Sequence, residues 1–154
     1  MKHESVKPYA DGDGKKKQVE SMFDRIAHRY DLLNRVLSGG IDTQWRRKAI
    51  KLAANDAPKR ALDIATGTGD MAILLARKAT DCDIIGLDIS GKMLDIAREK
   101  TQKRGLSDRI HFQQGDSENL PFSDNTFDVI TVAFGVRNFE NTLQGLKECN
   151  RVLK

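Results

Sequence analysis

Residues 62–70, LDIATGTGD, have the residue types and the spacing of a ligand-binding turn. An apolar run leads into Gly67 and Gly69, and the carboxylates of Asp63 and Asp70 stand on either side of them. Glycine lets the backbone turn tightly and lets a ligand approach it closely. The spacing also satisfies the dinucleotide fingerprint G-x-G-x-x-G/A, so a nicotinamide-dependent oxidoreductase is one candidate.

The charge of this turn argues against a dinucleotide. A dinucleotide places its pyrophosphate at the helix N-terminus, where Asp63 and Asp70 would repel it. Like charges ~4 Å apart cost on the order of 4 kcal/mol at an effective dielectric of ~20. A ligand with a cationic amine, a sulfonium centre and no phosphate, such as S-adenosylmethionine, is favoured. Asp70 has an equally good interpretation as a capping residue stabilised by the helix dipole.

The stretch GLDIS, residues 86–90, places Asp88 at the end of the next apolar run. An acid at this point of a nucleotide-binding fold accepts hydrogen bonds from the two ribose hydroxyls. The alternative is an N-cap for the following helix, a role that Ser90 can fill as well. Met93 is then expected beside the adenine, with packing in the core as its alternative role.

Two further polar stretches follow apolar runs. In QGDSENLPF, Asp116 and Ser117 stand where an adenine edge is expected, and a carboxylate can accept from the adenine amino group. Their alternative is a plain Asx or Ser turn before Pro121. After FDVITVAF, Arg137 and Asn138 are expected to face the reacting methyl group, with a surface charge as the alternative for Arg137.

The elements that position these residues follow from the apolar rhythm after residue 60. Strands are expected at 61–65, 83–87, 109–113 and 127–134, and helices at 70–79, 91–104 and 140–153. This alternation, with continuous apolar strands, predicts an α/β fold with a parallel sheet and helices on both faces. Ligands bind such sheets outside the carboxyl ends of the strands, where the residues described above lie.

The N-terminal part has a different pattern. Residues 1–14 predict a flexible tail. Residues 15–58 predict a helical region, for which two roles stay open: plain packing of its apolar stripe in the core, or a lid and substrate region over the site. From Val19 to Leu37, apolar residues recur at three- and four-residue steps, with a basic face opposite. Ser38-Gly39-Gly40 is expected to stop this helix.

A second helix is expected over about 43–54, capped by Asp42. Trp45 and Ile50 are predicted to point inward. Four cations are predicted to point largely outward, namely Arg46, Arg47, Lys48 and Lys51.

Charge and composition narrow the classes of function. Residues 1–60 carry 14 Lys+Arg and 8 Asp+Glu, a net +6, and the remainder carries 12 and 14, a net −2. The basic part suits an anionic membrane surface, nucleic acid or plain solvation. No apolar run approaches the ~20 residues of a membrane span. Neither a secretory signal nor a metal-ligand spacing is visible, so Cys82 and Cys149 are interpreted as reduced core residues of a cytoplasmic protein.

These stretches together resemble the class I S-adenosylmethionine-dependent methyltransferases. With RYDLLNRVLSGGIDTQWRR (residues 29–47), NTFDVITVAFGVRNF and the terminal RVLK, the chain resembles the menaquinone/ubiquinone biosynthesis C-methyltransferase family over roughly residues 17–154. The resemblance implies a Rossmann-like, S-adenosylmethionine-binding domain at 59–154. It also implies methyl transfer to a ring carbon of a polyprenylated quinol, converting a demethylmenaquinol to menaquinol, with transient docking on the membrane surface.

The resemblance also implies roles for individual residues. The cofactor is expected at Thr66, Asp88, Asp116 and Ser117, in addition to Asp63, Gly67, Gly69 and Met93. Arg137, Asn138, Tyr30 and Asn34 are expected to face the quinol, with Arg137 stabilising a developing phenolate or poising a water. His28 and Asp31 are other base candidates, for which structural roles are favoured. Where family members often carry serine, this chain has Ala133, so that hydroxyl contact is lost.

The family continues beyond RVLK with Pro-Gly-Gly and three more strands, so the chain is interpreted as an N-terminal part whose later strands are missing. The fourth strand would then be an exposed edge that favours pairing with another chain, including a homo-oligomer. Three alternatives to the quinol C-methyltransferase are kept. They are a methyltransferase of another small molecule or of nucleic acid, a nicotinamide-dependent oxidoreductase, and a chain that only binds the cofactor. Nucleic acid is disfavoured, since aromatic residues make up only 6%.

Overall fold

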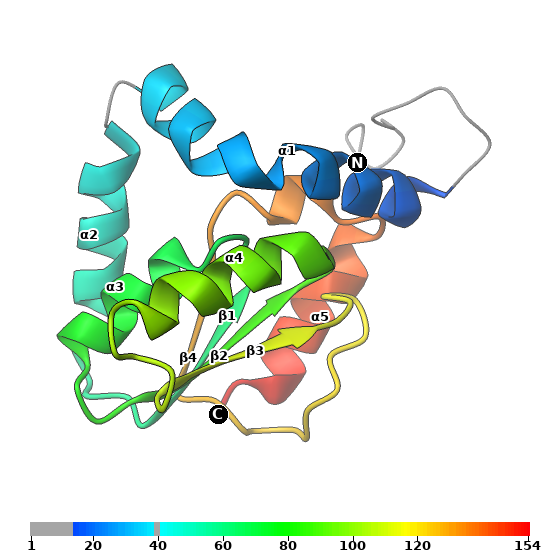
Figure 1. The fold of residues 1–154 in the computed structure, drawn as a ribbon. Helices are drawn as coiled ribbons and strands as arrows, with labels where there is room; N and C mark the ends of the chain where they lie inside the picture. Colours follow the sequence, from blue (N-terminus) through cyan, green and yellow to red (C-terminus); the bar gives the residue numbers. More distant parts are fainter. Residues whose placement is uncertain (1–13, 39–40) are drawn as a thin grey trace.

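The structure is a computed structural model that describes residues 14–38 and 41–154 (Figure 1). Its helices are α1 (Lys15–Ser38), α2 (Ile41–Ala53), α3 (Asp70–Lys78), α4 (Gly91–Gln102), the 3-10 helix η2 (Val136–Asn138) and α5 (Thr142–Val152). Its strands are β1 (Arg60–Ile64), β2 (Asp83–Asp88), β3 (Ile110–Gln114) and β4 (Val129–Val132). The predicted tail at 1–14, apart from Gly14, lies outside the described residues, and so do Gly39 and Gly40 of the predicted helix break.

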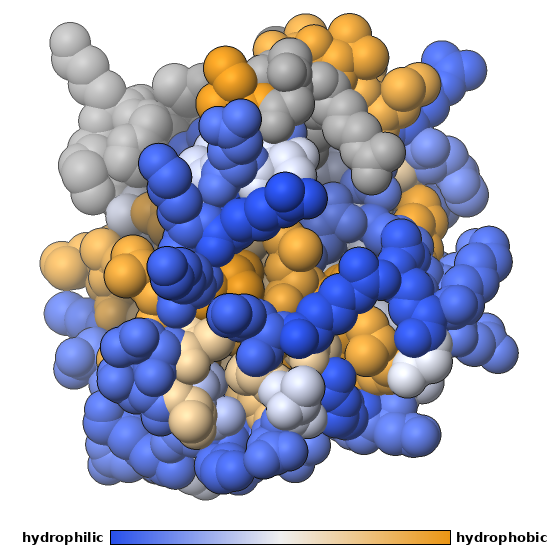
Figure 2. All heavy atoms as spheres, turned by 90° about the vertical axis from the view of Figure 1, so that its left-hand side faces the viewer, coloured by the Kyte–Doolittle hydropathy of each residue, from blue (hydrophilic) through white to orange (hydrophobic). Residues whose placement is uncertain are grey.

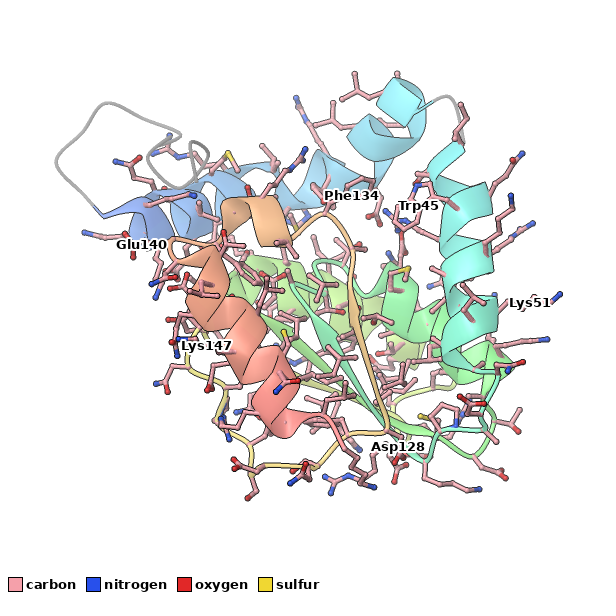
Figure 3. All side chains as sticks on the ribbon, turned by 180° about the vertical axis from the view of Figure 1, so that it is seen from behind. Trp45, Lys51, Asp128, Phe134, Glu140 and Lys147 are labelled. Atoms are coloured by element: carbon pink, nitrogen blue, oxygen red, sulfur yellow. The ribbon has the colours of Figure 1, made fainter. Side chains whose placement is uncertain are left out.

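The four strands form one parallel sheet in the order β3-β2-β1-β4. In the register of β1 with its two neighbours, Leu62 pairs with Ile85 on one side and with Ile130 on the other. Helices α3 and α4 lie on one face of this sheet and α5 lies on the other (Figures 1 and 3). The predicted fold class, an α/β fold with a parallel sheet and helices on both faces, is confirmed.

Strand β1 is buried on both faces, and this fixes the turn that follows it. Leu62 and Ile64 are fully buried on the α5 side, in a cluster with Phe127 and Val152. Ala61 points to the opposite face, into the cluster that includes residues of α3, because successive strand side chains alternate between the two faces. The glycine turn is therefore attached to the most rigid part of the sheet.

Strand β4 is shorter than the predicted strand at 127–134. Phe127 makes only an isolated bridge to Leu153, and Phe134 leaves the extended region with a φ of 62°. A bulky residue at positive φ is strained and is held there by its surroundings. The backbone turns at this point and leads into η2, which ends up above the carboxyl end of β4.

Helix α1 runs across the end of the sheet over α4, and α2 stands beside α3 (Figure 1). Polar contacts hold α1 in place: Lys15 Nζ donates to the Phe139 carbonyl (2.7 Å), and Ser90 Oγ donates to the Asp24 carboxylate (2.5 Å). The predicted apolar face is buried only in its first half. Val19 is 6% exposed, whereas Leu37 is 83% exposed.

The structure corrects two predictions on α2. The helix begins at Ile41, so Asp42 lies in the first helical turn and is not its N-cap. Arg46, predicted to point outward, is only 7% exposed. It shares an inward face with Ile50, one turn further on, and is compensated there by carboxylates: Nη1 lies 3.1 Å from Asp70 Oδ2 and Nη2 lies 3.6 Å from Asp42 Oδ2. The partner Asp70 comes from α3, so the sequence of α2 alone could not reveal this burial.

Candidate functional site

A cleft opens at the carboxyl ends of the strands. Its wall includes the residues that follow each strand or stand near its end, namely Ala65, Ile89, Gly115 and Ala133. This is the edge at which open parallel sheets bind their ligands. Helix α1 forms another wall of the cleft through residues that include Val19 and Phe23.

The cleft brings together most of the predicted site residues. Those lining it are Tyr30, Gly67, Asp88, Met93, Asp116, Ser117, Arg137 and Asn138. Asp63 and Thr66 line a smaller cavity next to it. Gly69 lines neither of the two, and the side chain of Asn34 lies outside the described part of the chain.

Asp88 is bound to the glycine turn. Its Oδ2 accepts a hydrogen bond from the Gly67 amide (2.8 Å), and its Oδ1 accepts one from the Ser90 amide (2.9 Å). Burial raises the pKa of Asp88, while these backbone donors act in the opposite direction. A carboxylate has about four lone-pair sites, so two remain for donors such as a pair of ribose hydroxyls. The alternative capping role is filled by Ser90, whose Oγ accepts from the Met93 amide (3.2 Å).

The two glycines of the turn serve different purposes. Both have positive φ, 57° at Gly67 and 81° at Gly69. A Cβ on Gly69 would lie 3.0 Å from the Phe112 ring and 3.2 Å from the Ala97 side chain, so this glycine lets the turn pack against β3 and α4. A Cβ on Gly67 would meet only the Tyr30 ring, at 3.8 Å, on the side of the cleft.

The adenine end of the predicted site is more crowded than expected. Asp116 Oδ2 accepts from Lys16 Nζ (2.7 Å), and Asp116 Oδ1 accepts from the Glu118 amide (2.9 Å) in an Asx turn. The turn proposed as the alternative for this stretch is therefore present, and Asp116 also lines the cleft. Met93 is 1% exposed, in agreement with its alternative role in the core, and it also lines the cleft. Lys16, which also lines the cleft, was missed by the sequence analysis.

Another part of the cleft wall is aromatic and basic. The Arg137 guanidinium lies over the Phe134 ring, 5.8 Å from its centroid. Phe134 in turn meets Trp45 of α2 edge-on, with ring centroids 5.1 Å apart (Figure 3). Neither His28 nor Asp31, the other base candidates, lines the cleft: His28 is exposed, and Asp31 accepts from Thr68 Oγ1 (2.6 Å) and Lys100 Nζ (2.8 Å).

The structure weakens the electrostatic argument made from Asp70. Its Oδ1 pairs with Lys100 Nζ (2.5 Å) and its Oδ2 pairs with Arg46 Nη1 (3.1 Å), so two cations compensate its charge. The capping role proposed for Asp70 is also not observed: Gly69 precedes α3 at the cap position, without a side-chain cap. The preference for S-adenosylmethionine over a dinucleotide therefore needs support other than the charge of Asp70.

Asp63 is the most perturbed acid of the turn. It is 1% exposed, and the hydroxyls of Thr66 and Thr131 each donate to it at 2.6 Å. Burial raises the pKa of Asp63 from 3.8 to about 6, against the lowering effect of the two hydroxyls. Burial therefore destabilises the ionised form of Asp63 in the folded protein, and a cation bound nearby would stabilise that form.

Asp63→Asn is expected to change the pH dependence of stability. Because the pKa of Asp63 is higher in the folded than in the unfolded chain, its stabilising contribution is present below ~pH 4 and is lost as the pH rises through about 6. The free energy of unfolding of the variant should therefore rise relative to wild type by up to ~3 kcal/mol between ~pH 4 and ~pH 7. Denaturant titrations at several pH values measure this difference, and parallel pH curves for the two proteins would contradict it.

Over residues 14–38 and 41–154, no group of three or more His, Cys, Asp or Glu side chains is placed to hold a metal ion.

A parallel sheet in this order, with an acid at the end of β2 bound to a glycine turn after β1, defines a Rossmann-like class of nucleoside-binding domain. Comparison with known proteins narrows the class. The ubiE/COQ5 methyltransferase family matches residues 12–154, and the chain belongs to this family. The resemblance predicted from the sequence is confirmed.

Individual relatives agree with this assignment. The chain is 52% identical to a demethylmenaquinone methyltransferase of Bacteroides fragilis, over 98% of this chain and 62% of that protein. It is 54% identical to one of Thermotoga maritima, over 93% of this chain and 60% of that protein. A crystal structure of an S-adenosylmethionine-dependent methyltransferase from Aquifex aeolicus matches with a TM-score of 0.58 and 29% identity, over 62% of this chain and 51% of that one. The chain thus spans about three fifths of the length of the two curated relatives.

Proposed function

We propose that this chain takes part in S-adenosylmethionine-dependent C-methylation of a polyprenylated demethylmenaquinol, giving menaquinol. The observation that carries the proposal is the cleft itself, where Asp88 and the glycine turn stand at one end and Arg137, Asn138 and Tyr30 stand around the same space. Membership of the ubiE/COQ5 family and the names of the two relatives support the methyl donor and the quinol.

The residues present fit S-adenosylmethionine. Asp88 keeps two lone-pair sites for ribose hydroxyls after its two backbone contacts. Met93 offers an apolar contact for a base, and Asp116 with Ser117 offers polar ones. Asp63, fully buried behind the turn, favours a cationic ligand. When bound, this donor supplies an electrophilic methyl group on a sulfonium centre.

The chain's own contribution to the reaction is orientation and charge. Arg137 is placed to stabilise the negative charge that develops on a quinol oxygen as the proton leaves, or to hold the water that takes the proton. In this proposal Tyr30 and Asn138 orient the ring, and residues of α1 line the cleft beside it. Good positioning alone can supply ~7–11 kcal/mol of the barrier.

The reaction class is tested with radiolabelled S-adenosylmethionine and two acceptors, demethylmenaquinol and its oxidised quinone. We expect label to enter the quinol only, because the oxidised ring is not a carbon nucleophile. Equal labelling of both acceptors would contradict the mechanism. Labelling of neither acceptor, by a chain that binds the donor, would contradict the quinol as substrate.

The membrane-docking proposal rests on the tip where α1 ends and α2 begins. Leu32, Val36, Leu37 and Ile41 are each at least 65% exposed there. Figure 2 shows this side of the molecule, with hydrophilic side chains over its middle and apolar ones gathered at its upper edge. Over the described residues no helix is long and apolar enough to cross a membrane. From this exposed apolar tip we propose that the protein docks reversibly on the cytoplasmic face of a membrane.

Docking is expected to depend on salt and on the apolar tip. Helix α2 also carries the exposed cations Arg47 and Lys48. Each cation near an anionic surface contributes about 1 kcal/mol of binding free energy. Sedimentation with vesicles of anionic phospholipid should show association that falls with added salt and falls further in Leu37→Ser. The matched control is Leu143→Ser, which changes an exposed leucine on α5 (60% exposed). Binding that ignores both salt and Leu37→Ser would contradict the proposal.

A further inference from the structure

One stripe of α5 binds the segment that connects β3 to β4. The stripe consists of Gln144, Glu148 and Arg151, and each of the three makes a hydrogen bond to the backbone of that segment. Residues three and four apart are neighbours on one face of a helix, so these side chains form a continuous polar row. None of them lines the main cleft, and Arg151 opens the terminal RVLK stretch. The methyl-transfer chemistry proposed above gives this row no role.

Arg151 uses its whole guanidinium group at this contact. Its Nε and Nη2 donate to the two carboxylate oxygens of Glu148 at 2.8 and 2.7 Å. Its Nη1 donates to the Phe122 carbonyl (2.7 Å) and to Asp124 Oδ1 (2.8 Å), and Nη2 also donates to the Leu120 carbonyl (3.0 Å). These five bonds match the five N–H donors that an arginine has. The guanidinium therefore fixes the segment at several points at once.

Leu120 is held by both members of the Glu148–Arg151 pair. Its amide donates to Glu148 Oε2 (2.8 Å), and its carbonyl accepts from Arg151. Leu120 is also 3% exposed, in the core cluster that contains Phe127. The hydrogen bond from Arg151 lowers the pKa of Glu148, so the pair stays charged at neutral pH. Charge-assisted bonds of this kind are about twice as strong as neutral ones.

The fixed residue ends the turn that carries Asp116 and Ser117 in the cleft wall. The Asp116 carbonyl accepts from the Asn119 amide (3.1 Å), and its Oδ1 accepts from the Glu118 amide (2.9 Å). Leu120 follows this turn directly. Because the turn is short and internally bonded, a displacement of Leu120 would displace Asp116 with it.

A second restraint on Asp116 comes from α1 and is weaker. Lys16 Nζ lies 2.7 Å from Asp116 Oδ2, with the two side chains 35% and 33% exposed. A single ion pair this exposed contributes about 0–1 kcal/mol. The bidentate contact between Arg151 and Glu148, whose side chain is 12% exposed, is the stronger restraint on the segment.

We propose that Arg151 and Glu148 are positioning residues for the cofactor, which hold the segment after β3 in the conformation that presents Asp116 to the adenine amino group. This inference rests on the proposed function, since it assumes that S-adenosylmethionine occupies the main cleft with its base at Asp116. The RVLK stretch then takes part in base recognition through the segment that it holds, without touching the ligand.

The first test compares two ligands in calorimetric titrations of the wild-type chain and of Arg151→Met. S-adenosylhomocysteine carries the adenine amino group, and S-inosylhomocysteine carries an oxygen in its place. Wild type should prefer the first ligand by roughly 10- to 150-fold, as for a hydrogen bond to a charged group. Arg151→Met should reduce this preference to a few-fold at most, because Asp116 is no longer held against the base.

The ratio of the two affinities decides the outcome. A wild-type ratio in Arg151→Met, even with both affinities lowered, would show a merely structural role and overturn the inference. Equal affinity of wild type for the two ligands would also overturn it while leaving the proposed function intact. No binding of S-adenosylhomocysteine by wild type would contradict the proposed function itself.

Two further variants guard this test. Arg151→Lys keeps the charge but lacks the planar fork that binds both oxygens of Glu148, so it should give an intermediate ratio. If Arg151→Met does not fold, Arg151→Lys decides alone, and a wild-type ratio would overturn the inference. Arg77→Met removes an exposed arginine of α3 that does not line the cleft, and as the matched control it should keep the wild-type ratio.

Coupling between Arg151 and Asp116 gives a second test. Asp116→Ala should weaken S-adenosylhomocysteine by roughly 10-fold or more in the wild-type background. The same substitution should cost much less in Arg151→Met, where Asp116 has already lost its position. Effects of independent residues add, so additive losses in the double variant would contradict the assignment.

Discussion

Asp88→Ala is expected to weaken binding of S-adenosylhomocysteine by roughly 10- to 150-fold, because charge-assisted hydrogen bonds worth ~1.5–3 kcal/mol are lost. In the structure Asp88 also holds the Gly67 and Ser90 amides. The substitution therefore removes the proposed ribose acceptor and also loosens the turn on which the ligand lies. Calorimetric titration measures the loss, after circular dichroism has shown that the variant is folded.

Two variants separate these effects of Asp88. Asp88→Asn keeps one acceptor oxygen and should lose less affinity than Asp88→Ala. Asp95→Ala removes a 75%-exposed carboxylate from the same βα unit, where Asp95 faces Arg98 at 2.9 Å, and should leave binding unchanged. Wild-type affinity in a folded Asp88→Ala chain would remove Asp88 from the site.

Arg137→Ala is expected to lower the rate of quinol methylation by roughly 100- to 1,000-fold, the usual cost of removing a donor to a developing oxyanion. Arg137 lines the cleft from η2, and because its proposed partner is the quinol oxygen, the affinity for S-adenosylhomocysteine should stay at the wild-type value. Single-turnover methylation of demethylmenaquinol measures the chemical step apart from product release.

The control for Arg137 is Lys147→Ala, which removes an exposed cation on α5 that does not line the cleft. It should methylate at the wild-type rate. If Arg137→Ala lost cofactor affinity and rate in parallel, Arg137 would belong to the cofactor end of the site, and the proposed role at the quinol oxygen would be wrong.

Much of the fold could be predicted because its signals are local. The strands that became β1, β2 and β3 each contain a short apolar stretch, and their observed bounds differ from the predicted ones by at most one residue. The rule that parallel sheets bind ligands at their carboxyl ends then placed Asp88 and Arg137 at one edge, and both line the observed cleft.

The features that were missed depend on contacts between distant elements. Arg46 was predicted outward with the other cations of its helix, and its burial depends on Asp70 of α3 in addition to Asp42 of α2. Lys16 lines the cleft because α1 crosses the edge of the sheet, where Lys16 forms an ion pair with Asp116. Phe134 has a positive φ, and β4 ends before it, although the sequence pattern predicted one strand over residues 127–134. None of these has a periodic signal in its own segment.

The central claim is that this chain forms a binding site for S-adenosylmethionine at the carboxyl ends of its strands. The most direct test is calorimetric titration of the folded chain with S-adenosylhomocysteine and, separately, with NADH. The account predicts saturable binding of S-adenosylhomocysteine and none of NADH. Binding of NADH alone would contradict it and would assign the turn at residues 62–70 to a dinucleotide instead.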